Sequence, residues 1–192
     1  MIIAFSTSSP QASVALIAPH GPVLAARSKF APMQASAACL EMLREMLDEL
    51  GTDLDKATVF AADLGPGSFT SVKVAVTLAK TFAFSRGVLA TGASSFDLIS
   101  TSATVVFPSK KGEWFVRWPG QEPVRQIELP DEPVVGYGSG LEDQRYPDAG
   151  GFVHLLESLE PNDPKMLLPN YIVEPSISHP KNPLSPLGTG NA

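Results

Sequence analysis

Cysteine, histidine and long apolar runs are all scarce in this chain of 192 residues. The only cysteine, Cys39, has no internal partner, which excludes a disulfide framework and fits a reducing compartment. No stretch of about 18 apolar residues occurs, which argues against a membrane span. The amino terminus has a short apolar stretch without a basic segment before it, so we expect no signal peptide and a cytoplasmic location.

Positive charge is also in short supply. The chain carries 14 Lys and Arg against 20 Asp and Glu, a net charge of -6. A lone nucleic-acid binder needs a basic surface to neutralise phosphates, so this balance argues against one. If RNA is involved, we expect another subunit to hold most of it.

The first half of the chain alternates between strand and helix patterns. Apolar runs and turn residues predict strands at 2–5, 12–18, 23–28 and 57–64, and helical periodicity predicts helices at 35–50 and 69–85. In the second helix the apolar residues spread over an arc of roughly 200°. The remaining polar sector holds Lys73, Thr77, Lys80 and Thr81. We expect a helix of this kind to be packed on two sides, inside the domain or against a partner.

The second half predicts a smaller lobe. We expect a helix at 96–101, strands at 103–107, 113–118, 124–128 and 134–137, and a helix near 152–159. The domains are then 1–102, 103–174 and a proline-rich, flexible tail at 175–192. This α/β order suggests the two-lobed, ribonuclease-H-like layout of the actin-like ATPase superfamily, as one option among several α/β folds.

The most distinctive segment is a glycine-rich turn at the start of a helix. Two glycines around a proline, followed by Ser and Thr, expose backbone N–H groups at the positive end of a helix dipole, where a phosphate can bind. The candidate phosphate-binding residues are Gly65, Pro66, Gly67, Ser68 and Thr70. The plainer interpretation, which residue chemistry alone favours, is a tight turn with Ser68 as N-cap. Asp63, before the turn, is either a ligand group at a strand end or a cap for the turn.

Other chemistry has little support in the sequence. The sequence around Ser68 lacks the Gly-x-Ser-x-Gly pattern of a serine nucleophile. The histidines that could act as its base are His20 in a turn, His154 in a second-lobe helix and His179 in the tail. Isolated histidines and one cysteine show no metal-ligand spacing. We therefore predict no catalytic residues and no metal site.

Residues 64–73, Leu-Gly-Pro-Gly-Ser-Phe-Thr-Ser-Val-Lys, closely resemble the Gly-Pro-Gly-Ser-Phe-Thr-Gly-Leu/Val-Arg signature of the bacterial TsaB (YeaZ) family. Further segments match that family in order. They are Phe-Ser-Thr-Ser at 5–8, Ser-Val-Ala-Leu at 13–16, Gly-Ala-Ser-Ser-Phe at 92–96, Gly-Tyr-Gly-Ser-Gly at 136–140 and Pro-Asn-Tyr-Ile at 169–172. The match spans most of residues 1–175.

The resemblance implies a non-catalytic scaffold subunit of the machinery that makes N6-threonylcarbamoyladenosine in tRNA. In that family the first two helices pair with TsaD, which performs the transfer, while the ATPase TsaE joins them and tRNA is met only through the complex. The resemblance further implies ATP or ADP at a site shared with TsaD, and a homodimer when TsaD is absent. The interface residues would be Leu40, Leu43, Leu47, Ser71, Val74, Ala75, Leu78 and Phe82.

Two positions and one segment depart from the family pattern. Ser6 replaces the first-strand Asp, Gln34 replaces a frequent His, and Pro108-Ser109-Lys110 replaces an Asp-Ala-Arg segment. Ser6 removes a carboxylate that places metal and phosphate in active relatives of the superfold, which weakens an independent ATPase interpretation. The alternatives left open are an ATP-binding phosphotransferase or hydrolase that uses the glycine turn, and a peptidase that uses Ser68.

Overall fold

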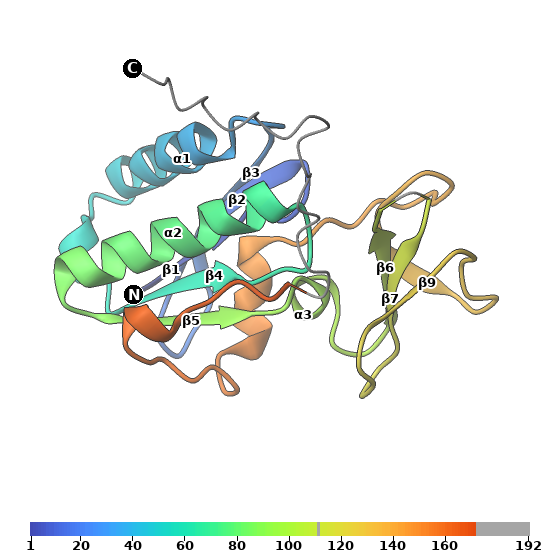
Figure 1. Cartoon of the computed structure of the whole chain (residues 1–192). Helices are drawn as coiled ribbons and strands as arrows, with labels where there is room; N and C mark the ends of the chain where they lie inside the picture. The colour runs from blue at the N-terminus through green and yellow to red at the C-terminus, as the bar shows by residue number, and fades with distance from the viewer. Residues whose placement is uncertain (111, 172–192) are drawn as a thin grey trace, which may run out of the picture.

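The computed structural model describes residues 1–110 and 112–171 and contains two separate β-sheets (Figure 1). The first sheet has the order β3-β2-β1-β4-β5. Its strands are β1 (Ile2–Ser6), β2 (Gln11–Ile17), β3 (Val23–Phe30), β4 (Val59–Asp63) and β5 (Leu89–Ala93). The first three pair antiparallel as a meander, and β4 and β5 continue the sheet parallel to β1.

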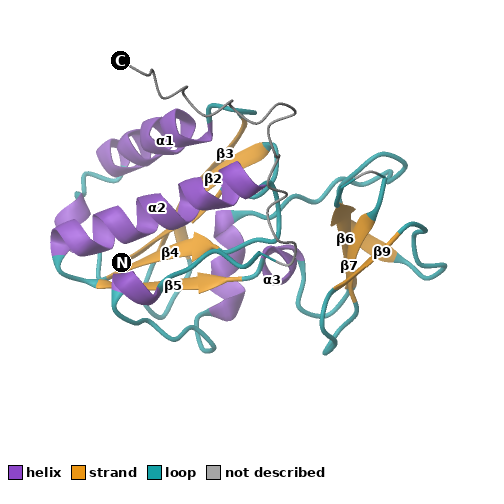
Figure 2. Ribbon diagram, viewed as in Figure 1, coloured by secondary structure: helices purple, strands orange, loops and turns teal. Residues whose placement is uncertain are grey.

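Two helices cover one face of this sheet, α1 (Ala35–Glu49) and α2 (Phe69–Arg86), as Figure 2 shows. The inner side of α1 buries side chains at helical spacing: Ala38, Cys39, Met42, Leu43, Met46 and Leu47. After α2 the chain turns at Gly87, whose left-handed φ of 63° lets its N–H reach the carbonyl groups of Ala83 and Phe84. Both predicted helices are thus confirmed.

Most apolar side chains of α2 pack in the core of the same chain. Val72, Ala75, Val76, Ala79 and Ala83 are buried, and the partly buried Leu78 and Phe82 pack against the same core. The side chains left on the outer surface of α2 include Lys73, Thr77 and Thr81. Packing within the domain therefore accounts for most of the predicted apolar arc, and Val74 is left partly exposed.

The opposite face of the first sheet is covered by the 3-10 helix η2 (Ala149–Leu155). The sequence predicted a helix near 152–159 in the second lobe. A helical segment overlaps that range, but it is a 3-10 helix that ends at Leu155, and it packs against the first sheet. Ala149, Phe152 and Leu155 are buried against Ile2, Ala4 and neighbouring residues of the first sheet. Three apolar residues at i, i+3 and i+6 suit the three-residue turn of a 3-10 helix, in which such positions eclipse each other.

The central strand β1 is covered on both faces. Ile3 and Phe5 belong to the core beneath α1 and α2, whereas Ile2 and Ala4 belong to the core beneath η2. Successive side chains of a strand point to opposite faces, so this continuous apolar run supplies both cores at once.

The second sheet has the order β8-β7-β6-β9 and lies beyond the short helix α3 (Ser95–Ile99) (Figure 1). Its strands are β6 (Thr104–Pro108), β7 (Trp114–Arg117), β8 (Val124–Gln126) and β9 (Val134–Gly136), each within or close to its predicted range. An aromatic core of Phe96, Phe107, Phe115 and Tyr137 joins this sheet to α3. The 3-10 turns η1 (Leu54–Lys56) and η3 (Pro164–Met166) complete the elements of the described residues.

The tail predicted at 175–192 and residue 172 of the closing motif lie outside the described residues. Within the part of the chain that is described, no helix has the length and apolar character that crossing a membrane requires.

Candidate functional site

Three loops that follow strands of the first sheet meet at one edge. They are the β1–β2 loop at 7–10, the glycine turn at 64–68 and the segment from β5 into α3. Because β1, β4 and β5 run parallel, their carboxyl ends lie at the same edge, where ligands gather in open α/β sheets. The amino terminus of α2 starts at this edge.

A buried carboxyl group, Asp63, holds these loops together. The Ser6 and Ser8 hydroxyls donate to its Oδ2 at 2.7 and 2.5 Å, and the Ser95 hydroxyl donates to its Oδ1 at 2.6 Å. The backbone N–H of Gly65 also donates to Oδ1, at 2.9 Å. The interpretation of Asp63 as a cap for the turn is therefore confirmed.

Asp63 has hydroxyl and amide partners but no basic partner in the described part of the chain. Burial raises the pKa of Asp63 above its usual range, and hydrogen bonds from Ser8, Ser95, Ser6 and Gly65 counteract this only in part. Desolvation disfavours the charged form of an acid, so the site favours a neutral carboxyl group. A carboxylate at the position of Ser6 would stand beside this one, because the Ser6 hydroxyl is 2.7 Å from Oδ2 of Asp63.

Two glycines are required by the shape of the turn. Gly65 has a φ of +90°, and a Cβ atom at Gly67 would lie 2.4 Å from the carbonyl oxygen of Ser8. The Ser68 N–H donates to that same oxygen at 3.2 Å. Ser68 occupies the N-cap position of α2, so the N-cap prediction is confirmed, although its side chain makes no capping hydrogen bond.

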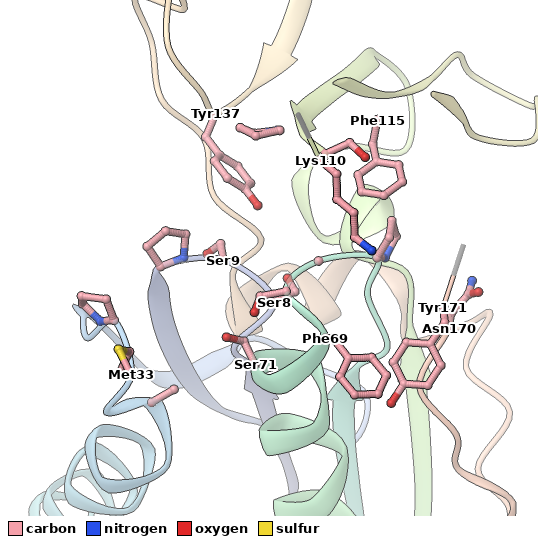
Figure 3. Close-up of a pocket in the computed structure, with 18 of the residues that line it drawn as sticks. Ser8, Ser9, Met33, Phe69, Ser71, Lys110, Phe115, Tyr137, Asn170 and Tyr171 are labelled. Carbon is pink, nitrogen blue, oxygen red and sulfur yellow. The ribbon is translucent and has the colours of Figure 1, made fainter. Parts of the chain in front are cut away.

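Above the Asp63 cluster lies a cavity of about 630 Å³ between the two sheets. Figure 3 shows Ser8 and Ser9 beside the start of α2, with Tyr137 and Lys110 from the second lobe facing them. Of the residues predicted to bind phosphate, Pro66, Gly67 and Ser68 line this cavity. Gly65 and Thr70 do not, and the Gly65 N–H is already bonded to Asp63.

Tyr137 and Lys110 are site residues that the sequence did not single out. Tyr137 lies in the Gly-Tyr-Gly-Ser-Gly segment and Lys110 in the Pro-Ser-Lys segment at 108–110. Burial raises the pKa of Tyr137 further above its already high value, so its hydroxyl stays protonated. Both residues belong to the second lobe, and they reach the cavity because the second sheet lies beside the loops of the first sheet.

The predicted interface residues divide by exposure. Leu43, Leu47 and Ala75 are buried in the core, and the Phe82 ring stacks on Phe5 and Phe60, so the prediction of these four as partner contacts is corrected. Leu78 is partly buried against the same core. Leu40 is 44% exposed, and Ser71 and Val74 are partly exposed.

The sequence missed two apolar side chains beside α1. Phe30 at the end of β3 is 68% exposed, and Met33 in the following turn is fully exposed. A groove between β3 and α1 is lined by Phe30, Leu40 and neighbouring residues. The signal that could have found them is the pair of large apolar residues, Phe30 and Met33, just before the predicted helix.

The peptidase and metal interpretations gain no support from the geometry. No side chain in residues 1–110 and 112–171 hydrogen-bonds the Ser68 hydroxyl. His20 and His154 line a different cavity, with Glu157, and His179 lies outside the described residues. Among the described residues there is no group of three or more His, Cys, Asp and Glu that could hold a metal ion.

The sequence and the fold of this chain were compared with those of known proteins. Residues 29–111, which run from the end of β3 to β6, match the family model described as TsaD, tRNA N6-adenosine threonylcarbamoyltransferase. YeaZ from Pseudomonas aeruginosa superposes with a TM-score of 0.71 over 89% of this chain and 99% of its own, at 20% identity. The chain is TsaB/YeaZ-like. Its fold is the actin-like, ribonuclease-H-like fold that the sequence predicted.

A second structure from Pseudomonas aeruginosa gives the same result. It is an uncharacterized protein with similarity to the peptidase YEAZ, and it superposes with a TM-score of 0.75 over 90% of this YeaZ-like chain and 99% of its own, at 18% identity. No curated protein matches the sequence significantly. The likeness to these two structures therefore establishes the fold, and activity has to be argued from the residues.

Proposed function

We propose that this chain is a non-catalytic scaffold subunit of the tRNA N6-threonylcarbamoyladenosine transferase machinery and forms a heterodimer with TsaD. The observation that carries the proposal is the match of residues 29–111 to the TsaD family model, together with the burial of Asp63 beneath the cavity. Residues 1–110 and 112–171 place no carboxyl group in the cavity lining and hold no metal-ligand cluster, which suits a subunit that pairs with a catalytic relative. By this proposal the protein works in the cytoplasm.

The outer face of α1 and α2 is the contact surface in this proposal. Leu40 and Val74 supply exposed or partly exposed apolar area, and Thr77 and Thr81 are short side chains on the same side of α2. Helices pack at interaxial distances set by the side chains between them, so a surface of short side chains allows partner helices to approach closely. Phe30 and Met33 extend this apolar surface at the start of α1.

Other partners follow from the same proposal. TsaE would join the heterodimer, and tRNA would be held by the complex, since this chain has a net charge of -6. ATP or ADP would bind at a site shared with TsaD. Without TsaD, the same outer face would support a homodimer.

The experiment is size-exclusion chromatography with light scattering on the chain mixed with TsaD from the same organism, followed by threonylcarbamoyl transfer to tRNA. We expect a stable complex, and faster transfer with the chain present than with TsaD alone. No complex and no stimulation would contradict the proposal. Transfer by this chain alone would contradict its non-catalytic part.

Variants then locate the interface. Val74→Glu and Leu40→Glu each place a charge in the apolar contact and should cost about 2 to 5 kcal/mol of binding. Ile127→Glu, at a 75% exposed apolar residue of the second lobe, is the matched control and should bind TsaD like the native chain. If both helix variants still copurify with TsaD, the proposed face is wrong.

A further inference from the structure

The chain crosses between its two lobes twice, and the short helix α3 lies on the first of these crossings (Figure 1). The first crossing runs from β5 through α3 to β6, and the second runs from β9 back to η2. Proteins that open and close their lobes do so at a few crossing residues whose backbone angles are free to change. The contacts made at each crossing therefore decide whether the lobes can move.

The inner side of α3 is fixed to the first lobe. Ser95 is fully buried, its N–H donates to the carbonyl oxygen of Gly65 at 2.8 Å, and its hydroxyl donates to Asp63 at 2.6 Å. Leu98 is buried in the core between the first sheet and η2. Gly151 of η2 lies so close that an added Cβ atom would be 2.7 Å from the Leu98 carbonyl oxygen. Helix α3 therefore cannot shift against the first sheet without breaking buried contacts.

The other side of α3 is fixed to the second lobe. Phe96 is buried and packs on Phe107 of β6, with the ring centroids 4.6 Å apart. Ile99 packs against the same aromatic core. A helix of five residues thus contributes Leu98 to the core of one lobe and Phe96 and Ile99 to the core of the other. Because close-packed cores resist sliding, α3 is held by both lobes at once.

Arg117 of β7 adds polar contacts between the second sheet and α3. Its guanidinium group donates to the Asp97 carboxylate and to the carbonyl oxygen of Ser100, the residue that follows α3. The same group lies over the ring of Phe96, 5.5 Å from its centroid. Only 13% of the Arg117 side chain is exposed, and Nε has no partner among the described residues, so the terminal nitrogens make all of its hydrogen bonds. Hydrogen bonds of a charged group are strong, and this shielded place weakens them less than the open surface would.

The second crossing is held in the same way. Tyr146 packs against the aromatic core of the second lobe. The next residue, Pro147, accepts a hydrogen bond from the buried Ser6 hydroxyl at 3.1 Å, and the Ala149 N–H donates to the buried Ser13 hydroxyl at 2.8 Å. The chain therefore passes from a contact with one lobe to a contact with the other without a free residue between them.

We propose that the two crossings hold the lobes at one fixed angle, so that the chain is a single rigid unit and does not close its lobes around a ligand. A rigid unit presents its surface in one arrangement, and a partner then loses little binding free energy in ordering it. The proposal concerns the contacts of this chain and does not depend on TsaD. Failure of the heterodimer would leave it intact, and lobes that moved would leave the heterodimer intact.

The test is the distance between the lobes in solution, measured by electron paramagnetic resonance on a pair of nitroxide labels. Lys56→Cys on η1 and Val124→Cys on β8 place one label at an exposed position of each lobe, in a chain that also carries Cys39→Ala. Dilution with unlabelled chain removes distances between copies. We expect one narrow distance distribution, and ATP with Mg²⁺ should shift its mean by less than about 2 Å. A broad or two-peaked distribution, or a larger shift, would overturn the proposal.

Matched variants test the contacts themselves. Ser6→Ala together with Arg117→Met removes polar contacts from both crossings but keeps an unbranched side chain over Phe96, and should widen the distance distribution about twofold or more. Arg125→Met is the control, because Arg125 pairs with Glu113 inside the second lobe, and it should leave the width unchanged. Circular dichroism verifies the fold of each variant. A folded double variant with the original width would contradict the proposal, and if that variant does not fold, the distribution of the labelled chain without it decides.

Discussion

The hydroxyl group of Thr7 takes the place of a helical hydrogen bond of Ala75. It accepts from the Ala75 N–H at 3.0 Å and donates to the carbonyl oxygen of Ser71 at 2.6 Å, the two groups that an uninterrupted α-helix would join directly. Thr7 is fully buried in the loop after β1. The loop and the first turns of α2, which form adjacent walls of the cavity, are therefore fixed to each other.

Thr7→Val keeps the shape of this side chain and removes its hydroxyl group. The Ala75 N–H and the Ser71 carbonyl group would then lose their partner in a buried place, and we expect a loss of about 1 to 3 kcal/mol in the free energy of unfolding. Urea denaturation measures it. Thr58→Val, at an exposed threonine, is the control and should change stability by less than about 0.5 kcal/mol. If Thr7→Val and Thr58→Val changed the free energy of unfolding equally, the hydrogen bonds of Thr7 to α2 would not contribute to stability.

Asp63 should make stability depend on pH in an unusual direction for an acid. Because burial raises its pKa above 3.8 in the folded chain, the folded state holds its proton at pH values where the unfolded state has released it. Stability from this group is then complete below the unfolded pKa and is lost as pH rises through the folded pKa. We expect the free energy of unfolding of the native chain, relative to Asp63→Asn, to fall as pH increases from about 4.

Denaturant titrations of both chains at several pH values measure this difference. Burial also raises the pKa of Asp148, but that group is present in both chains and cancels in the comparison. Asp131→Asn, at an exposed aspartate, serves as the control for loss of a surface charge. A difference that grows as pH rises would show that hydrogen bonds to Asp63 outweigh its desolvation.

Cys39 should be unreactive while the chain is folded. It lies on the buried inner side of α1, and burial raises the pKa of its thiol to about 12. A shift from the usual range to that value lowers the thiolate fraction near pH 8 by about a thousandfold, and the thiolate is the reacting form. Labelling with a thiol-specific disulfide reagent should be slow in buffer and fast in urea. Rapid labelling without denaturant would mean that α1 separates readily from the sheet.

The sequence predicts the elements well where periodicity and turn residues agree. The apolar spacing of α1 and the glycine that ends α2 depend on neighbours within a few residues, and both helices were found where expected. Periodicity shows which side chains of α2 are apolar but does not show which neighbour covers them. Leu43, Leu47 and Ala75 were therefore assigned to a partner although they pack in the chain's own core.

The site could be predicted only in part for a similar reason. The glycine turn and Asp63 are adjacent in sequence, so their local relationship was accessible. Tyr137 and Lys110 reach the same cavity from a separate sheet, and η2 returns from the second lobe to cover the first sheet. Contacts of such long range have no local signal in a single sequence.

Gly67 should be the least replaceable residue of the glycine turn. A Cβ atom there would lie 2.4 Å from the Ser8 carbonyl oxygen and 3.0 Å from its carbonyl carbon, and this backbone cannot move aside without displacing the loop that carries Thr7 and Ser8. Gly67→Ala should therefore cost about 2 to 4 kcal/mol of stability, as overpacking against backbone does.

Gly87→Ala is the matched control, because its left-handed φ of +63° strains alanine while nothing lies within 4 Å of the added atom. It should cost only about 1 kcal/mol. Urea denaturation of both variants gives the comparison, and a Gly67→Ala chain as stable as Gly87→Ala would mean that the two loops are not in this close contact.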